Sequence, residues 1–308
     1  MYEKAENFSL IEVLSFLVSK LRYIVYTSLL FAFISAIVSL SINNKYTSSA
    51  IVKISDNQYQ GNSFLSSSPQ IGGLASFAGI SIPGSENDPT EYVISTIQSR
   101  NFLKHLLTFK DIDINLVAAE SYNFSKNQIT YNKELYDIKD QKWIRKPQGT
   151  KKTIPSHLEI YNDFYSKNLR VSKDKSSGFI RISYEHISPT FAKDFLDLVI
   201  EQINEVARKK DISSSEKIIN FFEVEKQNIM LNSVDKIINE ILEEQFKILS
   251  FANAKEEYLI ERIEYPFAPE IKSSPKRIAI TILGGLIGAI SSLLFYLIQN
   301  FYRNMKNL

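Results

Sequence analysis

Two stretches of sequence decide the architecture of this chain: residues 23–44, YIVYTSLLFAFISAIVSLSINN, and residues 278–302, IAITILGGLIGAISSLLFYLIQNFY. Neither stretch contains a charged residue, and each is bounded on both sides by Lys or Arg. Because a helix rises about 1.5 Å per residue, they extend roughly 33 and 37 Å, against a hydrocarbon core of about 30 Å. The sequence therefore predicts transmembrane helices at 23–44 and 278–302.

The charges outside the two stretches predict their orientation. The basic residues of the flanks are Lys4, Lys20, Arg22, Arg303 and Lys306. Short flanks that carry Lys and Arg stay in the cytoplasm, whereas a long loop is translocated largely regardless of its charge. We expect a protein of the bacterial inner membrane, with a cytoplasmic N-terminal segment at 1–22, a cytoplasmic tail at 303–308, and residues 45–277 in the periplasm.

A cleaved signal peptide is the alternative for the first stretch, because Ala32 and Ala36 are small residues near its end. The core of a signal peptide is about 7 to 15 residues long, however, and this apolar run is longer. It also follows a segment, residues 1–22, whose apolar residues have an amphipathic spacing. We favour a retained helix, with residues 1–22 along the inner membrane surface or beneath the spans.

The composition excludes several classes of protein. The chain has 36 Lys and Arg against 34 Asp and Glu, and removing the flanks leaves 31 of each in the loop, so no basic footprint for nucleic acid exists. It has no cysteine, which excludes disulfides, thiolate metal sites and a cysteine nucleophile. The loop of about 230 residues is long enough for one sizeable core, or for a core with an extension.

The periodicity of the loop predicts an α+β domain with a long helical extension. The first half of the loop predicts a strand at 46–55 and then a surface loop with an apolar island at 71–82 that should be buried. A helix opened by Asp88-Pro89 is expected at 88–109. Residues 115–152 read as an irregular excursion with a short strand or helix at 129–143. A short helix capped by Ser156 and a hairpin of 169–172 with 178–184 follow.

An unusually long helix is expected at about 189–231, since no Pro or Gly interrupts its apolar pattern after Pro189. A shorter helix at about 233–252, capped by Ser233, and a strand at 258–265 come next. A helix of roughly 40 residues would be about 60 Å long, against about 11 or 12 residues for a typical globular helix. Such length indicates an elongated shape or packing between copies.

No arrangement of residues for catalysis is recognisable. His105, His157 and His186 are far apart and lack metal-ligand spacing, and no nucleophile elbow or phosphate-binding loop occurs. The paired carboxylates Glu243-Glu244 and Glu256-Glu257 are typical of solvated helix faces. We expect no catalytic, metal-binding or cofactor-binding residues, and no enzymatic activity.

Residues 242–277, LEEQFKILSFANAKEEYLIERIEYP followed by FAPEIKSSPKR, resemble the C-terminal signature of the Wzz-type chain-length determinants, the polysaccharide co-polymerases. Residues 72–80, GGLASFAGI, and 99–102, SRNF, resemble further motifs of that family. The chain departs from the proline rhythm of many members, because Lys272 stands where a third proline would fall. Because no G-x-x-x-x-G-K-[ST] motif occurs, we expect no fused kinase of the kind found in the capsule-associated relatives.

Two segments are candidate functional sites. The segment before the second span contains Pro266, Pro269, Pro275, Lys276 and Arg277. Its prolines favour an extended polyproline II spacer between the loop and the span, although a simple helix-blocking boundary is an equal alternative. In the span, Gly284 and Gly288 form GxxxG, and Gly285 and Ala289 repeat the spacing. Small residues of this kind let helices pack closely, within one chain or between copies.

The resemblance implies a regulator of the chain length of a lipid-linked surface polysaccharide, such as the O-antigen of lipopolysaccharide. It would act as a non-catalytic homo-oligomer, a ring in the lipid bilayer, beside a membrane polysaccharide polymerase and the growing glycan chain. The alternative is an envelope adaptor of the capsule-export type, which shares this topology. A two-span sensor would need a longer cytoplasmic segment for output, and a periplasmic enzyme is the least favoured reading.

Overall fold

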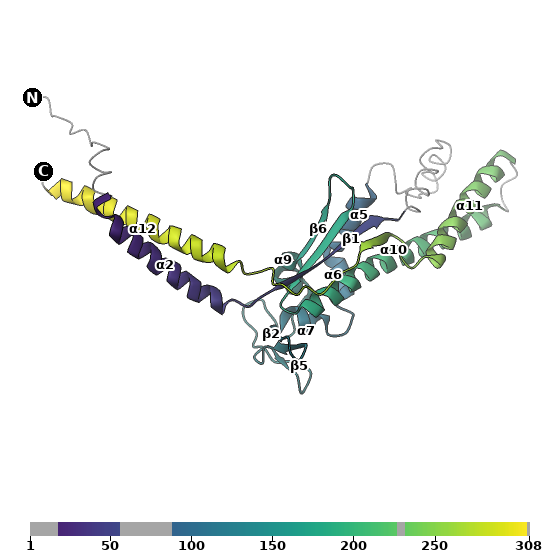
Figure 1. Ribbon diagram of the computed structural model, residues 1–308. Helices are drawn as coiled ribbons and strands as arrows, with labels where there is room; N and C mark the ends of the chain where they lie inside the picture. The colour runs from purple at the N-terminus through teal and green to yellow at the C-terminus, as the bar shows by residue number, and fades with distance from the viewer. Residues whose placement is uncertain (1–17, 56–87, 227–231, 307–308) are drawn as a thin grey trace, which may run out of the picture. The chain divides into compact units, whose positions relative to one another are not determined.

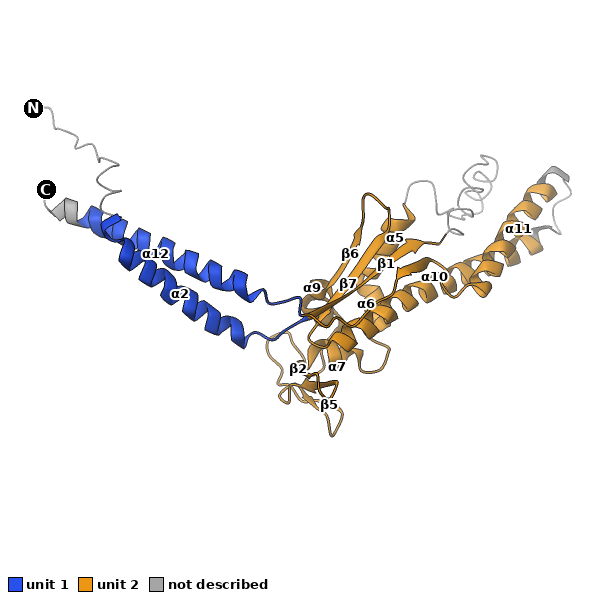
Figure 2. Cartoon of the chain, in the orientation of Figure 1, with its two compact units in different colours: residues 1–45, 272–308 blue, residues 46–271 orange. Residues whose placement is uncertain are grey.

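The structure is a computed structural model, and it describes residues 18–55, 88–226 and 232–306 (Figure 1). The chain divides into two compact units, residues 1–45 with 272–308, and residues 46–271 (Figure 2). The predicted apolar island at 71–82 and most of the N-terminal segment lie outside the described residues.

The first unit is a pair of helices, α2 (Leu21–Ser41) and α12 (Arg277–Lys306). Residues 21–41 and 277–302 are long enough and apolar enough to cross a membrane, and few of their residues are buried. Their large apolar side chains point outward: Leu29, Phe33, Ile37 and Leu40 on α2, and Leu283, Leu286, Ile290 and Leu294 on α12. The prediction of two apolar helices around an α+β region is confirmed.

The second unit contains a four-stranded antiparallel sheet in the order β6-β7-β1-β8. The strands are β1 (Tyr46–Ile54), β6 (Leu169–Lys173), β7 (Ile180–His186) and β8 (Ile260–Glu264). The predicted hairpin corresponds to β6 and β7, with Val171 opposite Ile182. Strand β1, which follows the first helix in sequence, pairs with β8, which precedes the last helix.

One face of the sheet carries the core. Residues of β1 alternate between buried and half-buried along the whole strand, as expected for a strand covered on one face. The buried residues of β7 continue this face, and α10 (Pro189–Lys226) packs on both strands (Figure 1). The buried side chains of α10 that meet the sheet and the neighbouring helices include Phe195, Leu196, Val199, Ile200 and Ile203.

The single helix expected at 88–109 is wrong, because the structure has two helices there, α5 (Pro89–Ile97) and α6 (Arg100–Leu106). Asp88 caps α5 by accepting a hydrogen bond from the Thr90 N–H, as predicted. Ser99 interrupts the run in an extended conformation, and its hydroxyl accepts from the Phe102 N–H. A serine that caps the backbone locally can end one helix and start another without changing the apolar pattern.

The excursion at 115–152 is more regular than its sequence indicates. After α7 (Ile112–Val117) it forms two small hairpins, β2 (Ala119–Asn123) with β3 (Gln128–Tyr131), and β4 (Tyr136–Asp137) with β5 (Lys142–Trp143). These strands are two to five residues long, which is too short for periodicity to reveal them. Three short helical turns follow: α8 (His157–Ile160), η1 (Tyr161–Tyr165) and α9 (Ser166–Asn168), and Ser156 caps the first.

Helix α10 continues beyond the sheet, where it packs against α11 (Asn232–Ala254) (Figure 1). A second, smaller apolar cluster holds them together, formed by Ile218 and Phe222 of α10 with Ile237, Ile238, Ile241 and Leu242 of α11. Closer to the sheet, the buried side chain of Asn204 accepts hydrogen bonds from the N–H groups of Leu259 and Ile260, at 2.7 and 2.9 Å. This amide therefore fixes α10 to the start of β8.

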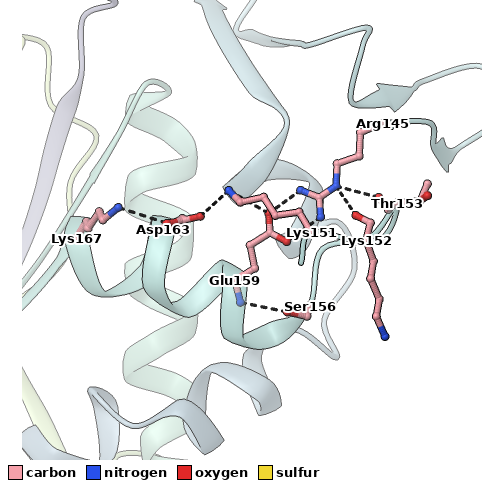
Figure 3. A network of polar contacts seen from close by, with 8 residues as sticks. All are labelled: Arg145, Lys151, Lys152, Thr153, Ser156, Glu159, Asp163 and Lys167. Carbon is pink, nitrogen blue, oxygen red and sulfur yellow. Dashed lines mark hydrogen bonds and ion pairs between the residues drawn. The ribbon is translucent and has the colours of Figure 1, made fainter. Parts of the chain in front are cut away.

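A buried ion pair fastens the excursion to the short helices (Figure 3). The guanidinium of Arg145 donates two hydrogen bonds to the carboxylate of Glu159, at 2.6 and 2.7 Å. Its Nε donates to the carbonyl oxygens of Lys152 and Thr153, which closes the loop 145–153. Lys151 adds an ion pair with Asp163 at 3.0 Å. Both partners of the central pair are about nine-tenths buried, so their geometry is fixed.

The ion pair predicts a pH dependence of stability. The bonds from Arg145 hold the pKa of Glu159 below its ordinary value of 4.5. The contribution of ionised Glu159 to the free energy of unfolding is therefore complete above pH 4.5. It is lost as the pH falls through the pKa of Glu159 in the folded state. We expect Glu159→Gln to lower the free energy of unfolding at pH 7 by on the order of 3 kcal/mol, because the Arg145 charge loses its buried partner.

Thermal unfolding at pH 7 and pH 3, followed by circular dichroism, measures this effect. The gap between wild type and Glu159→Gln should shrink at pH 3, and Glu134→Gln, at an exposed position of the same excursion, should match wild type at both values. A gap of equal size at both pH values would contradict the assignment.

Candidate functional site

The predicted small residues of α12 lie against α2 in the same chain. A β-carbon added to Gly288 would lie 2.7 Å from Cβ of Phe31 and 2.9 Å from the carbonyl oxygen of Thr27. One added to Gly284 would lie 2.7 Å from the Ser35 hydroxyl. Carbon atoms prefer separations of about 3.5 to 4.0 Å, so only glycine fits at these two positions.

Gly285 and Ala289 differ from that pair. A β-carbon on Gly285 would meet Cβ of Ala32 at 3.5 Å, an ordinary contact. Ala289 is half-buried. The close approach is therefore concentrated at Gly284 and Gly288, one turn apart on α12.

Two serines of α2 use this close approach to hydrogen bond across the pair. The Ser28 hydroxyl donates to the carbonyl oxygen of Gly285 at 2.8 Å, and the Ser35 hydroxyl donates to that of Ile280 at 2.9 Å. Such bonds between helices contribute about 0.6 to 2 kcal/mol each in a membrane. Ser28 and Ser35 are two helical turns apart, so both lie on the face of α2 that meets the glycines.

Each end of the helix pair carries a further contact. At one end the rings of Tyr23 and Tyr296 are 6.3 Å apart, and the Lys20 ammonium lies within 6 Å of both ring centres. At the other end the Asn44 side chain accepts from Arg277 at 3.2 Å and from Lys272 at 3.4 Å. The helices therefore run antiparallel, with aromatic rings at one end and a polar junction at the other.

The proline segment runs alongside the start of β1. Its prolines Pro266 and Pro269 are buried in the second unit, and the Ser48 hydroxyl donates to the carbonyl oxygen of Phe267 at 2.8 Å. In the first unit Lys45 forms an isolated antiparallel bridge with Ser274.

The other three residues of the proposed proline site, Pro275, Lys276 and Arg277, belong to the first unit. The bond between Ser274 and Pro275 is cis. Lys276 is exposed, and Arg277 contacts Asn44. The polyproline II spacer stays a prediction. The bridge between Lys45 and Ser274 shows that the segment after α2 and the segment before α12 lie side by side.

Two of the three histidines, His105 and His186, have structural partners, and His157 is exposed at the start of α8. Nε2 of His105 lies 2.8 Å from the side-chain oxygen of Gln202. Nδ1 of His186 accepts from the Ser188 N–H, so its Nε2 carries the proton and donates to the carbonyl oxygen of Asn115 at 3.0 Å. In the described ranges, no group of three or more His, Asp and Glu side chains could hold a metal ion.

The paired carboxylates of α11 differ in exposure. Glu243 is largely exposed, and an ion pair links it to Lys247 at 3.3 Å. Glu244 is buried, and burial raises its pKa. The expectation of a solvated helix face is therefore wrong for Glu244, which forms an ion pair with Lys247 at 3.8 Å.

Sequence reasoning missed the residues that complete the helix pair. Ser28, Ser35 and Asn44 were read as ordinary members of an apolar run or its edge. The seven-residue spacing of Ser28 and Ser35 on one helix face was the available signal, but it becomes meaningful only once the facing glycines are known. Arg145 and Glu159 had no signal, because nothing in the sequence pairs positions 14 residues apart across a loop.

One family model matches part of the chain. Residues 6–108, roughly a third of the chain, match the family model described as Wzz, chain length determinant protein, which confirms the resemblance noted in the sequence. The match ends before the proline segment. No curated protein matches the chain.

Two solved structures are similar to this chain over most of its length. A full-length bacterial polysaccharide co-polymerase is 14% identical, with 96% of this chain and 99% of that chain covered and a TM-score of 0.36. A fragment of WzzB, a polysaccharide co-polymerase from Salmonella Typhimurium, is also 14% identical, with 75% and 100% covered and a TM-score of 0.31.

The helix interface predicts the effect of added bulk. In Gly284→Leu/Gly288→Leu the new side chains overlap α2, so we expect the helices to separate by at least about 1 Å and to lose both serine bonds. Spin labels on cysteines introduced at Leu30 and Leu286, which are exposed, should report a longer and broader distance. Ala279→Leu adds a similar side chain at an exposed position of α12 and should leave the distance unchanged. An unchanged distance in the double variant would refute the interface.

Proposed function

We propose that this chain regulates the chain length of a lipid-linked surface polysaccharide, of the O-antigen type, without catalysing bond formation itself. The observation that carries the proposal is the match of residues 6–108 to the chain length determinant family, in a chain whose two apolar helices enclose an α+β unit. The structural partners of His105 and His186 and the burial of Glu244 agree with a role that is not catalytic.

The proposal places α2 and α12 in the bacterial inner membrane. Outward-facing Leu, Ile and Phe side chains are stable in lipid, and the hydroxyl and carbonyl groups between the helices satisfy each other. The basic residues of the flanks favour cytoplasmic positions for 1–22 and 303–308. Residues 45–277 would then lie in the periplasm, where a surface glycan is polymerised.

The second part of the proposal is that copies assemble into a ring. Beyond the sheet, α10 and α11 leave several large apolar side chains exposed: Phe221, Val224, Phe246 and Phe251. Exposed apolar side chains on a helical hairpin are suited to burial against another copy. The proposed partners are thus identical chains, the membrane polysaccharide polymerase and the growing glycan, with chain length set by the assembly.

The proline segment would transmit the position of the α+β unit to the second span. Pro266 and Pro269 are buried and Ser48 holds Phe267, so the segment is fixed at its start, while Asn44 and Lys45 hold it near α12. The alternative function, an adaptor of capsule export, shares the topology, and no observation favours it.

Deletion of the gene tests the proposal. We expect polymerisation to continue without regulation, so the clustered length distribution of the surface glycan becomes broad and weighted to short chains on a gel ladder. Expression of the wild-type protein or of His105→Ala in the deletion strain should restore the clustered length distribution. Phe246→Asp should not, because a charge on an exposed apolar position opposes assembly without disturbing the core. Loss of all polymer on deletion would contradict a regulatory role and favour an enzyme.

A further inference from the structure

Residues 119–154 carry a surface that the proposed function leaves without a role. They contain eight Lys and Arg against four Asp and Glu, a net charge of +4, whereas the whole chain has a net charge of +2. The remainder of the chain is therefore slightly negative. Positive charge is concentrated in these two small hairpins and the loop after them.

The positive charges are displayed at the surface. The exposed lysines of this surface are Lys126, Lys133, Lys139, Lys142, Lys146, Lys151 and Lys152. Arg145 is the exception, because it is buried and bound to Glu159 (Figure 3). Its ion pair holds the loop that carries Lys146, Lys151 and Lys152. Lys151 is paired with Asp163 and Lys142 with Asp140, so both are partly neutralised, whereas Lys146 and Lys152 extend from a fixed loop.

Large exposed apolar side chains alternate in sequence with the lysines. Phe124 is 56% exposed, Ile138 54%, Ile144 41% and Ile154 66%. Exposed aliphatic side chains between lysines suit the boundary between lipid headgroups and acyl chains, where the apolar groups leave water and the ammonium groups meet phosphates. A hydrated glycan offers no comparable partner for Ile138, Ile144 and Ile154.

The length of the connecting chain limits how far Phe124 can lie from the end of the first apolar helix. The ring of Phe124, at the turn of the β2-β3 hairpin, packs edge-on against Tyr46 with centroids 5.3 Å apart. Tyr46 is the fifth residue after Ser41, where α2 ends. Five residues span at most about 18 Å, whatever the orientation of the two units.

We propose that residues 119–154 rest on the anionic lipid surface of the bilayer that α2 and α12 cross, with Phe124 in the interface and the lysines on lipid phosphates. This inference depends on the proposed membrane placement of α2 and α12. It assigns the excursion a role in holding the α+β unit against the membrane.

The absence of cysteine permits a direct test with the full-length chain. Single cysteines are introduced at Ser125, beside Phe124, at Val224, on the exposed part of α10, and at Leu294, in α12. Each variant is labelled with bimane and reconstituted in lipid nanodiscs containing phosphatidylglycerol and a nitroxide-labelled lipid. Quenching by the nitroxide reports contact with lipid.

We expect at least twofold more quenching at Ser125 than at Val224, and strong quenching at Leu294. Two further variants are made in the Ser125→Cys background: Phe124→Ser, and a triple variant with Lys126, Lys139 and Lys146 changed to Gln. Each should reduce the quenching at position 125 toward the level measured at position 224. Quenching at Leu294 alone would overturn this inference and leave the spans in place. No quenching at Leu294 would overturn the membrane placement as well. Shielding of Ser125 by purified glycan, without lipid quenching, would assign the surface to glycan and overturn the inference.

Discussion

The close contact of α2 with α12 is the constraint on which the rest of the structure depends. Apolar helices in lipid gain little from the hydrophobic effect when they meet, so their association depends on tight packing and hydrogen bonds. Gly284 and Gly288 permit the approach, and Ser28 and Ser35 bond across it. The pair joins the two ends of the chain, and the strands next to those ends in sequence, β1 and β8, are neighbours in the sheet. Entry to and exit from the α+β unit are therefore side by side.

The features that the sequence predicted are those with long periodic patterns. The two apolar helices, the long helix after Pro189 and the hairpin of β6 with β7 follow from uninterrupted or alternating apolar residues over many positions. The single helix at 88–109 failed because Ser99 can cap a new helix without breaking the apolar pattern. The hairpins β2-β3 and β4-β5 were hidden because their strands are too short for periodicity, and the stabilising ion pair of Arg145 with Glu159 is set by tertiary structure.

The candidate site was predictable in part for the same reason. GxxxG identified the face of α12 that packs, while the partner helix could have belonged to the same chain or to another copy. The structure places that partner in the same chain, and the outward faces of both helices and several apolar side chains of α10 and α11 are exposed. His186 makes local hydrogen bonds, and Glu244 is buried although its sequence is typical of a solvated helix face.

The central claim is that two packed helices hold the α+β unit on the outer side of the inner membrane. Cysteine accessibility tests it most directly, because the chain has no native cysteine. In cells with a permeabilised outer membrane, a membrane-impermeant maleimide should label Ser125→Cys at once and Asn307→Cys only after lysis. Labelling of Asn307→Cys in unlysed cells, or of Ser125→Cys only after lysis, would contradict the account.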